Sequence, residues 1–276
     1  MEVTRVSVAV ETRAPSGQTS AYLLGSDPAV LVDPAARSDR LDALAADRDV
    51  GHVAVTHHHP DHVGAVAHYA DRHDATVWAR VGRADDFESA TGVSPDRAFA
   101  EGTTVPTGRG VVRVVDTPGH APEHVGFAAD EGAGDAALVC GDLAVAEGSV
   151  VVAPPEGDMR VYLTSLRRVH AMGFERLLPA HGPTVEGSAV RATATRLVAH
   201  RLERERRVRE AVEAGAATAA DVCDAAYDKD LTGIRDLAEA TVRAHLEKLA
   251  VEGSVHWDGE RARPTEGRSR GERETE

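Results

Sequence analysis

The stretch Thr56-His57-His58-His59-Pro60-Asp61-His62 decides what fold and chemistry we expect of this chain. An apolar run ends here and a helical pattern begins after Pro60, so the stretch joins a strand to a helix. Side chains two positions apart on an extended segment point the same way, so His57 and His59 can share one metal ion and His58 should point away. Asp61 and His62 open the helix and can face a second metal ion. Imidazole and carboxylate groups are usual zinc ligands.

Three more candidate ligands follow predicted strands farther along the chain. They are His120 in DTPGH, Asp142 in VCGD and His181 in LLPAHG. Each lies close to a glycine, which lets the backbone approach a site closely. Loops at the strand ends of one sheet edge are where sites are built. Seven candidates in this order therefore predict a single site that holds two metal ions.

Up to about residue 190, short Val-rich runs alternate with turns that contain Gly, Pro and Asp. We expect strands at Val3–Val10, Ala21–Leu24, Ala29–Asp33, His52–Thr56, Thr76–Ala79, Val111–Asp116, Val125–Ala129, Ala137–Cys140 and Arg176–Pro179. Apolar residues at helical spacing predict helices at Arg40–Arg48, Val63–His73 and Arg160–Met172. Many strands with helices between them predict a layered fold.

The pattern changes after Gly187. Helices are expected at Ser188–Gly215, Ala219–Tyr227 and Ile234–Glu252, and Asp258-Gly259 is a typical two-residue hairpin turn. Three helices followed by a small hairpin are the plan of a winged helix. We therefore expect a metal-binding domain at residues 1–190, a winged-helix domain at 191–263 and a disordered tail at 264–276, where apolar residues are almost absent.

The composition limits the partners. The net charge is -14 and the chain has only two lysines, which suits either a salt-adapted archaeon or a GC-rich bacterium and shows no broad surface for nucleic acid. The sequence has neither an apolar run near the roughly 20 residues that cross a bilayer nor a signal peptide. We expect a cytoplasmic protein without a membrane partner, in which Cys140 and Cys223 are separate buried thiols.

The H-x-H-x-D-H pattern, followed in order by His120, Asp142 and His181, resembles the metallo-β-lactamase superfamily. The resemblance covers about residues 1–190 and implies an αββα sandwich of the α+β class. It implies that the first metal takes His57, His59 and His120, that the second takes Asp61, His62 and His181, and that Asp142 bridges both. Asp33, in LVDP, matches an early aspartate of the superfamily that orients a ligand. His124 is expected to be structural or to support a ligand.

The ligand set also separates branches of the superfamily. Class B β-lactamases are exported and lack the Asp61–His62 pair, and flavodiiron-type oxygen reductases have Glu in place of His59. Histidine there favours zinc and hydrolysis, and persulfide dioxygenases with one iron are a minor alternative. The C-terminal stretches HRLERE, DVCDAAY and AHLEKLAVEG are similar to the winged-helix extension of the beta-lactamase-like protein 2 family. Glyoxalase II is similar at the metal motifs, but in this chain we expect the winged helix in place of its glutathione-binding helices.

We therefore expect a hydrolase with two Zn²⁺ ions, although Fe or Mn would also fit the ligands. A metal-bridging hydroxide, held in line by Asp61, would attack the ester or thioester carbonyl of a small molecule. The alternative is an endoribonuclease that cleaves single-stranded RNA, since the beta-lactamase-like protein 2 family includes such enzymes. A DNA-binding metal sensor is a third hypothesis. The winged helix could instead pack over the rim of the site or form a homodimer contact.

Overall fold

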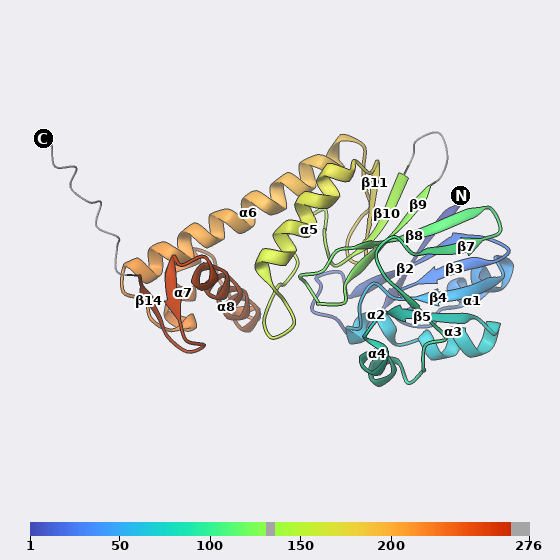
Figure 1. The fold of residues 1–276 in the computed structure, drawn as a ribbon, viewed down its shortest axis with the longest axis horizontal. Helices are drawn as coiled ribbons and strands as arrows, with labels where there is room; N and C mark the ends of the chain where they lie inside the picture. The colour runs from blue at the N-terminus through green and yellow to red at the C-terminus, as the bar shows by residue number, and fades with distance from the viewer. Residues whose placement is uncertain (131–135, 266–276) are drawn as a thin grey trace, which may run out of the picture.

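Two six-stranded sheets lie face to face in the computed structural model, which describes residues 1–130 and 136–265 (Figure 1). The first sheet has the strand order β1-β2-β3-β4-β5-β6, antiparallel from β1 to β3 and parallel from β3 to β6. Its strands are β1 (Val3–Ala9), β2 (Gln18–Gly25), β3 (Ala29–Val32), β4 (Val50–Ala54), β5 (Thr76–Arg80) and β6 (Arg97–Phe99).

The second sheet has the order β12-β11-β10-β9-β8-β7, and its only parallel pair among the described strands is β10 with β11. Its strands are β7 (Thr104–Thr107), β8 (Gly110–Asp116), β9 (Val125–Asp130), β10 (Ala136–Gly141), β11 (Arg176–Pro179) and β12 (Val185–Glu186). The parallel strands β4, β10 and β11 precede the loops that carry the candidate ligands, except for the loop of His120, which follows the antiparallel strand β8.

The alternation of side chains along each strand builds the layers. Tyr22 and Leu24 of β2 pack into the core between the sheets, against Phe127 and other residues of the second sheet. Leu23 points the opposite way, into the core beneath the helices. Helices α1 (Asp39–Asp47), α2 (Pro60–Val63), α3 (Val66–His73) and α4 (Ala84–Thr91) cover the first sheet. Helices α5 (Met159–Met172) and α6 (Ser188–Glu213) cover the second. The predicted αββα sandwich is confirmed.

The predicted helix Val63–His73 is wrong in one respect, because it is two helices, α2 and α3. The backbone N–H of Ala65 donates to the carbonyl oxygen of Pro34 at 2.8 Å and so leaves the helical pattern. A Cβ on Gly64 would lie 2.5 Å from the carbonyl oxygen of Ala35, so this close approach requires glycine. Helix α4 and strands β6, β7 and β12 were not predicted.

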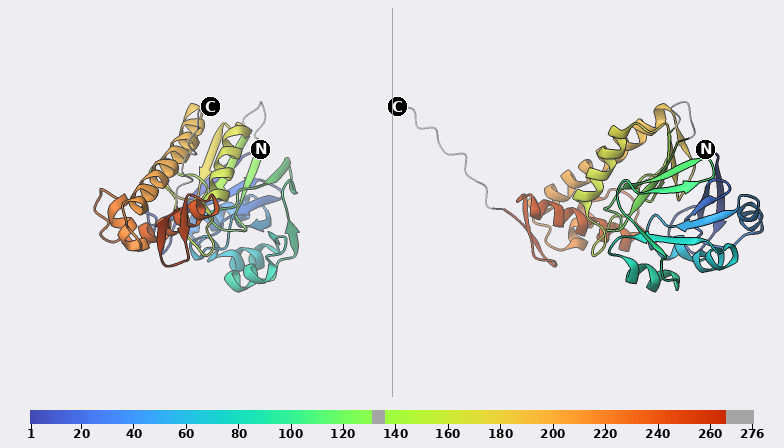
Figure 2. Two further views of the ribbon diagram at one scale, coloured as in Figure 1. Left: turned by 60° about the vertical axis from the view of Figure 1, so that its left-hand side comes forward. Right: turned by 45° about the vertical axis from the view of Figure 1, so that its right-hand side comes forward.

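The C-terminal elements are α6, α7 (Ala219–Ala226), α8 (Arg235–Val251), β13 (Val255–Trp257) and β14 (Ala262–Pro264). Helix α6 runs from the outer face of the second sheet to the other C-terminal helices (Figure 2). A capping box between Thr218 and Asp221 starts α7. Apolar residues from α6, α7, α8 and the hairpin share a core of their own. The element order is that of the predicted winged helix, whose assignment and domain boundaries stay predictions.

Pro264, the first residue of the predicted tail, pairs with Val255 in the hairpin. The rest of that tail, from residue 266, lies outside the described residues. Within the described part of the chain, no helix combines the length and apolar character needed to cross a membrane. Cys140 and Cys223 are both free and buried, as predicted.

Candidate metal centre

The seven predicted ligands meet at the edge of the sandwich, although they come from separate segments of the chain. Their ligand atoms form three overlapping groups in which all atoms lie within 4.8 Å of one another. The groups are His57, His59 and His120; His57, His62 and Asp142; and Asp61, His62 and His181. The structure thus brings together all the residues that the sequence selected, and His58 is in none of the groups.

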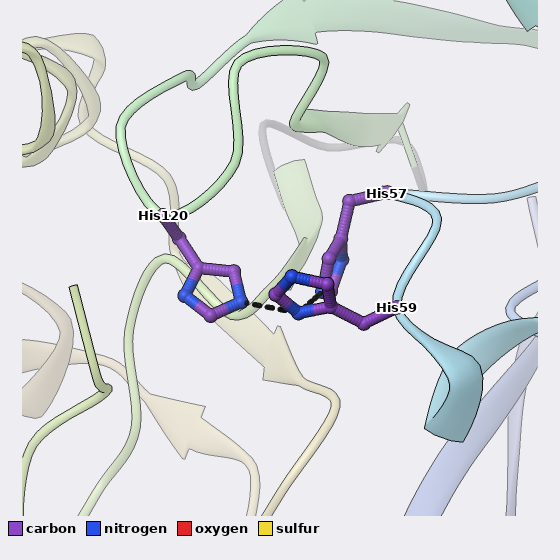
Figure 3. A group of neighbouring side chains, drawn as sticks. All are labelled: His57, His59 and His120. Carbon is purple, nitrogen blue, oxygen red and sulfur yellow. Dashed lines mark hydrogen bonds between the residues drawn. The ribbon is translucent and has the colours of Figure 1, made fainter. Parts of the chain in front are cut away.

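Three ring nitrogens converge in the first group (Figure 3). The Nδ1 atom of His59 lies 3.0 Å from Nε2 of His57 and 3.0 Å from Nε2 of His120. A neutral imidazole carries one N–H and one bare nitrogen, so the second nitrogen of each ring decides what faces the group.

The second nitrogens of His59 and His120 face oxygen acceptors. His120 Nδ1 lies 2.7 Å from the carbonyl oxygen of Val151, and His59 Nε2 lies 3.0 Å from a carboxylate oxygen of Glu156. A carbonyl or an ionised carboxylate only accepts hydrogen bonds, so these nitrogens carry the protons. The nitrogens that face the group are therefore bare.

Asp33 orients the imidazole rings of His57 and His62, the first through Thr56 and the second directly. The Thr56 hydroxyl donates to Asp33 Oδ2 at 2.8 Å, which leaves its oxygen to accept from Nδ1 of His57 at 3.0 Å. Nδ1 of His62 donates to the same carboxylate oxygen at 3.1 Å. In the neutral form of each ring, which is the form that binds a metal, the proton lies on Nδ1 and Nε2 is bare. The predicted orienting position of Asp33 agrees with these contacts, and Asp33 is buried immediately after β3.

The remaining ligands surround Asp142. His181 donates Nδ1–H to the carbonyl oxygen of Gln18 at 2.9 Å, and its Nε2 lies 3.4 Å from Asp142 Oδ1 and 3.5 Å from Asp61 Oδ2. The other oxygen of Asp142, Oδ2, lies 3.5 Å from Nε2 of His120. Asp142 therefore stands between the first group of nitrogens and the residues around His181.

Two buried atoms test whether these residues fit metal ions. Nε2 of His62 and Oδ1 of Asp142 are buried and have no hydrogen-bond partner within the described structure, and they lie 3.9 Å apart. An unpartnered buried polar atom is costly, so the fold normally supplies a partner. Five bare imidazole nitrogens and two carboxylates that face the same space form a donor set that divalent metal ions suit.

The electrostatics of the cluster agree with this fit. Burial, together with the neighbouring histidines, holds the pKa of His57 well below its ordinary value. Burial also lowers the pKa of His62. The carboxylates of Asp33, Asp142 and Asp61 outweigh this effect and raise the pKa of His62 to about 9. Without a cation the carboxylates thus draw a proton onto His62, and metal binding would displace that proton.

Sequence reasoning missed Thr12, whose hydroxyl donates to Asp61 Oδ2 at 2.6 Å. No local motif marks Thr12, because it lies 49 positions before its partner. His124, expected to be structural or supporting, accepts from the backbone N–H of Asp142 at 3.1 Å. Burial and the nearby His120 lower the pKa of His124 to about 3, so it stays neutral and can accept.

Glycines let the ligand loops pack tightly. A Cβ on Gly119, the residue before His120, would lie 2.2 Å from the backbone nitrogen of Tyr162 in α5. A Cβ on Gly141, the residue before Asp142, would lie 2.6 Å from Thr56 Oγ1. Both glycines also have positive φ, at 127° and 49°.

Comparisons with known proteins agree with this geometry. The family model of the metallo-beta-lactamase superfamily matches residues 14–181. Hydroxyacylglutathione hydrolase of Methylococcus capsulatus is 35% identical over 202 residues, which cover 71% of this chain and 75% of that protein. A beta-lactamase-like protein 2 homolog of Caenorhabditis elegans is 26% identical over 250 residues, which cover 86% of this chain and 80% of that protein.

A solved structure shares the whole fold. The metallo-beta-lactamase family protein from Thermus thermophilus superposes with a TM-score of 0.75 at 24% identity, over 95% of this chain and 98% of that chain. At this identity the likeness concerns the fold alone. The family match, the relatives and the three groups of His and Asp ligand atoms lead to one conclusion. This chain belongs to the metallo-beta-lactamase superfamily and is a metal-binding hydrolase.

Proposed function

We propose that the chain is a dinuclear zinc-dependent hydrolase that cleaves an ester or thioester bond in a small molecule. The observation that carries this proposal is the orientation of the five imidazoles in the cluster. Each ring places one nitrogen beside an oxygen atom of the protein and turns the other nitrogen toward the cluster. Such partners fix ring orientation and ligand basicity at metal sites.

His57, His59 and His120 would hold one ion, and Asp61, His62 and His181 would hold the second, with Asp142 shared between them. Nitrogen and carboxylate donors suit Zn²⁺, while Fe and Mn accept the same donors. When bound, such ions act as Lewis acids and lower the pKa of a bound water to about 7, which provides a nucleophile at neutral pH.

Asp61 is the residue that we assign to the chemical step. Thr12 holds its Oδ2, while Oδ1 lies 4.0 Å from Nε2 of His62, and the side chain is 18% exposed at the wall of a cleft. In this position the carboxylate can accept a hydrogen bond from the attacking water and hold it in line with the carbonyl carbon.

The name of the Methylococcus capsulatus relative supports the choice of bond, because an acylglutathione is a thioester. The endoribonuclease alternative needs a basic track for the phosphate backbone. The arginines of α6 do not supply one, since Arg206 and Arg207 form ion pairs with Glu203, and Arg209 lies 3.7 Å from Glu213. A DNA-binding sensor would face the same charge problem. A cytoplasmic location and a homodimer contact stay predictions.

The proposal is tested by screening purified protein of known metal content against acyl thioesters, lactones, phosphodiesters and single-stranded RNA at two salt concentrations. We expect hydrolysis of thioesters or esters that disappears on chelation and returns with Zn²⁺. His59→Ala should lose metal and turnover together, while His58→Ala should keep both, because His58 faces Phe87 and Glu123 instead of the cluster.

Two results would contradict the proposal. One is a His59→Ala protein with full zinc content and full turnover. The other is metal-dependent cleavage of RNA with no cleavage of any ester, which would favour the endoribonuclease.

A further inference from the structure

Five of the seven candidate ligands line a cleft of about 650 Å³, a volume typical of small-molecule sites. His59, Asp61 and His181 are among the residues that line it. The remaining walls come from the loop at residues 11–16, the loop at residues 145–151, Pro183, and Leu237 of α8.

Both loops are held by the C-terminal helices. Arg13 donates from both terminal nitrogens to the carboxylate of Asp236 at 3.0 Å, and from one of them to the carbonyl oxygen of Gly233 at 3.1 Å. Arg196 of α6 donates to the carbonyl oxygens of residues 145, 146 and 148 at 2.7–3.0 Å. Arg201 of α6 donates to the carbonyl oxygen of Val150. The C-terminal helices therefore shape the cleft as well as flank it.

Besides the candidate ligands, the lining of the cleft includes the apolar side chains of Ala14, Pro15, Val145, Val150, Val151 and Leu237. Leu237 is half-buried, so part of its side chain is open to a ligand. An apolar group that enters this space gains free energy in proportion to the surface it removes from water.

Outside the candidate ligands, the described lining of the cleft offers an anionic substrate no free cationic side chain. Glu11 and Glu147 are exposed on its walls, and among its described lining residues Arg13 is the single arginine or lysine. The guanidinium of Arg13 is already bound to Asp236 and Gly233. Glutathione carries two carboxylates, and a ligand of this kind normally requires free cationic or N–H donors at its site.

From these observations, and resting on the proposed function, we propose that the substrate is a thioester or ester of a neutral, apolar acyl group that lies against Leu237 and Val150. The carrier of that acyl group is not glutathione. Leu237 is then a specificity-determining residue that the C-terminal helices contribute to the site.

The test uses the metal-loaded full chain and two series of thioesters. Acyl chains of two, four, six and eight carbons are joined either to N-acetylcysteamine, which is neutral, or to glutathione. We expect kcat/KM on the neutral carrier to rise about two- to fourfold per added methylene until the cleft is filled. For equal acyl chains, the neutral carrier should exceed glutathione by about tenfold or more, as expected from the unpaired carboxylates.

Substitutions at Leu237 test whether this side chain causes the preference for long acyl chains. Leu237→Ala should lower kcat/KM for the octanoyl thioester about tenfold and leave the acetyl thioester within about twofold, since the contact with the isobutyl side chain is removed. Leu237→Met should restore most of the loss. Ile234→Ala is the matched control, because Ile234 precedes α8, is 39% exposed and does not line the cleft.

A binding measurement separates this inference from the proposed function. The non-hydrolysable thioether of octane and N-acetylcysteamine should bind with a Kd that is weakened by Leu237→Ala and unaffected by Ile234→Ala, even if no thioester is turned over. In that case only the proposed function fails. Thioester turnover that prefers glutathione, or that ignores both acyl length and Leu237, overturns the inference and leaves the proposed function standing.

Discussion

Asp33→Asn should weaken the second metal position selectively. The Asp33 carboxylate accepts from the Thr56 N–H at 2.6 Å on Oδ1, and from the Thr56 hydroxyl and His62 Nδ1 on Oδ2. Asparagine keeps the first bond through its carbonyl oxygen but places an NH₂ group where Oδ2 lies. The Thr56 hydroxyl oxygen has two lone pairs, so it can accept from that group and still accept from Nδ1 of His57, whereas the N–H of His62 cannot accept.

His62 then has two options, and both lower metal affinity. Its Nδ1–H can face the amide NH₂ without a bond, or the proton can move to Nε2, the atom that faces Asp61 and Asp142. A hydrogen bond to a charged acceptor contributes about 1.5–3 kcal/mol. The loss of one such bond corresponds to about a 10–100-fold lower affinity for one ion, which is the effect usually seen when the orienting partner of a ligand is removed.

The assay is a Zn²⁺ titration of metal-free protein in competition with a chromophoric chelator. The wild-type protein should fill two positions, and in Asp33→Asn one of them should weaken while the other stays within about threefold. Asp42→Asn is the control, because Asp42 also accepts from side chains, those of Tyr69 and Arg37, but lies outside the cluster. Unchanged binding of both ions in a folded Asp33→Asn protein would refute the role of Asp33.

Three further predictions concern the fold around the cleft. Gly119→Ala should lower the free energy of unfolding by about 3–5 kcal/mol, since its Cβ meets the backbone of α5, whereas Gly148→Ala, with positive φ but open space, should cost about 1 kcal/mol in chemical denaturation. Burial lowers the pKa of His245 below its ordinary value of 6.5, so the unfolded chain binds more protons at this residue than the folded chain. The free energy of unfolding should therefore fall as the pH drops below about 6.5. In thermal unfolding at pH 5–8, His245→Leu should make stability less dependent on pH. Arg196→Met should raise KM severalfold by releasing the cleft loop, with a smaller effect on kcat, while Arg206→Met, whose ion pairs lie on the surface, should leave both unchanged in steady-state kinetics.

The local sequence was sufficient to select the candidate ligands. His57 and His59 lie two positions apart on an extended segment, and His120, Asp142 and His181 each follow a strand near a glycine. These are short-range features, so periodicity and spacing reveal them without knowledge of the fold. A layered fold was predictable from the many strands with helices between them, whereas the αββα sandwich followed from the resemblance to the superfamily.

The sequence alone could not show which atom of each ligand is bare. That depends on acceptors far away in the chain, such as Gln18 for His181 and Val151 for His120. The division of one predicted helix at Gly64 likewise depends on the loop after β3, which approaches the backbone there. Contacts of this kind form only when distant segments pack, and a local pattern carries no record of them.

The cleft shows most clearly which features follow from the local sequence and which follow from packing. The sequence by itself determined that a His/Asp cluster would lie at the ends of strands, because ligand spacing is a local property of the backbone. Only the tertiary structure decided that Leu237, far beyond His181 in the chain, faces the same space and that Arg13 is bound to α8. The physical reason is that the shape and charge of a cavity are set by side chains that meet across the fold, and such meetings follow from packing and not from order along the chain.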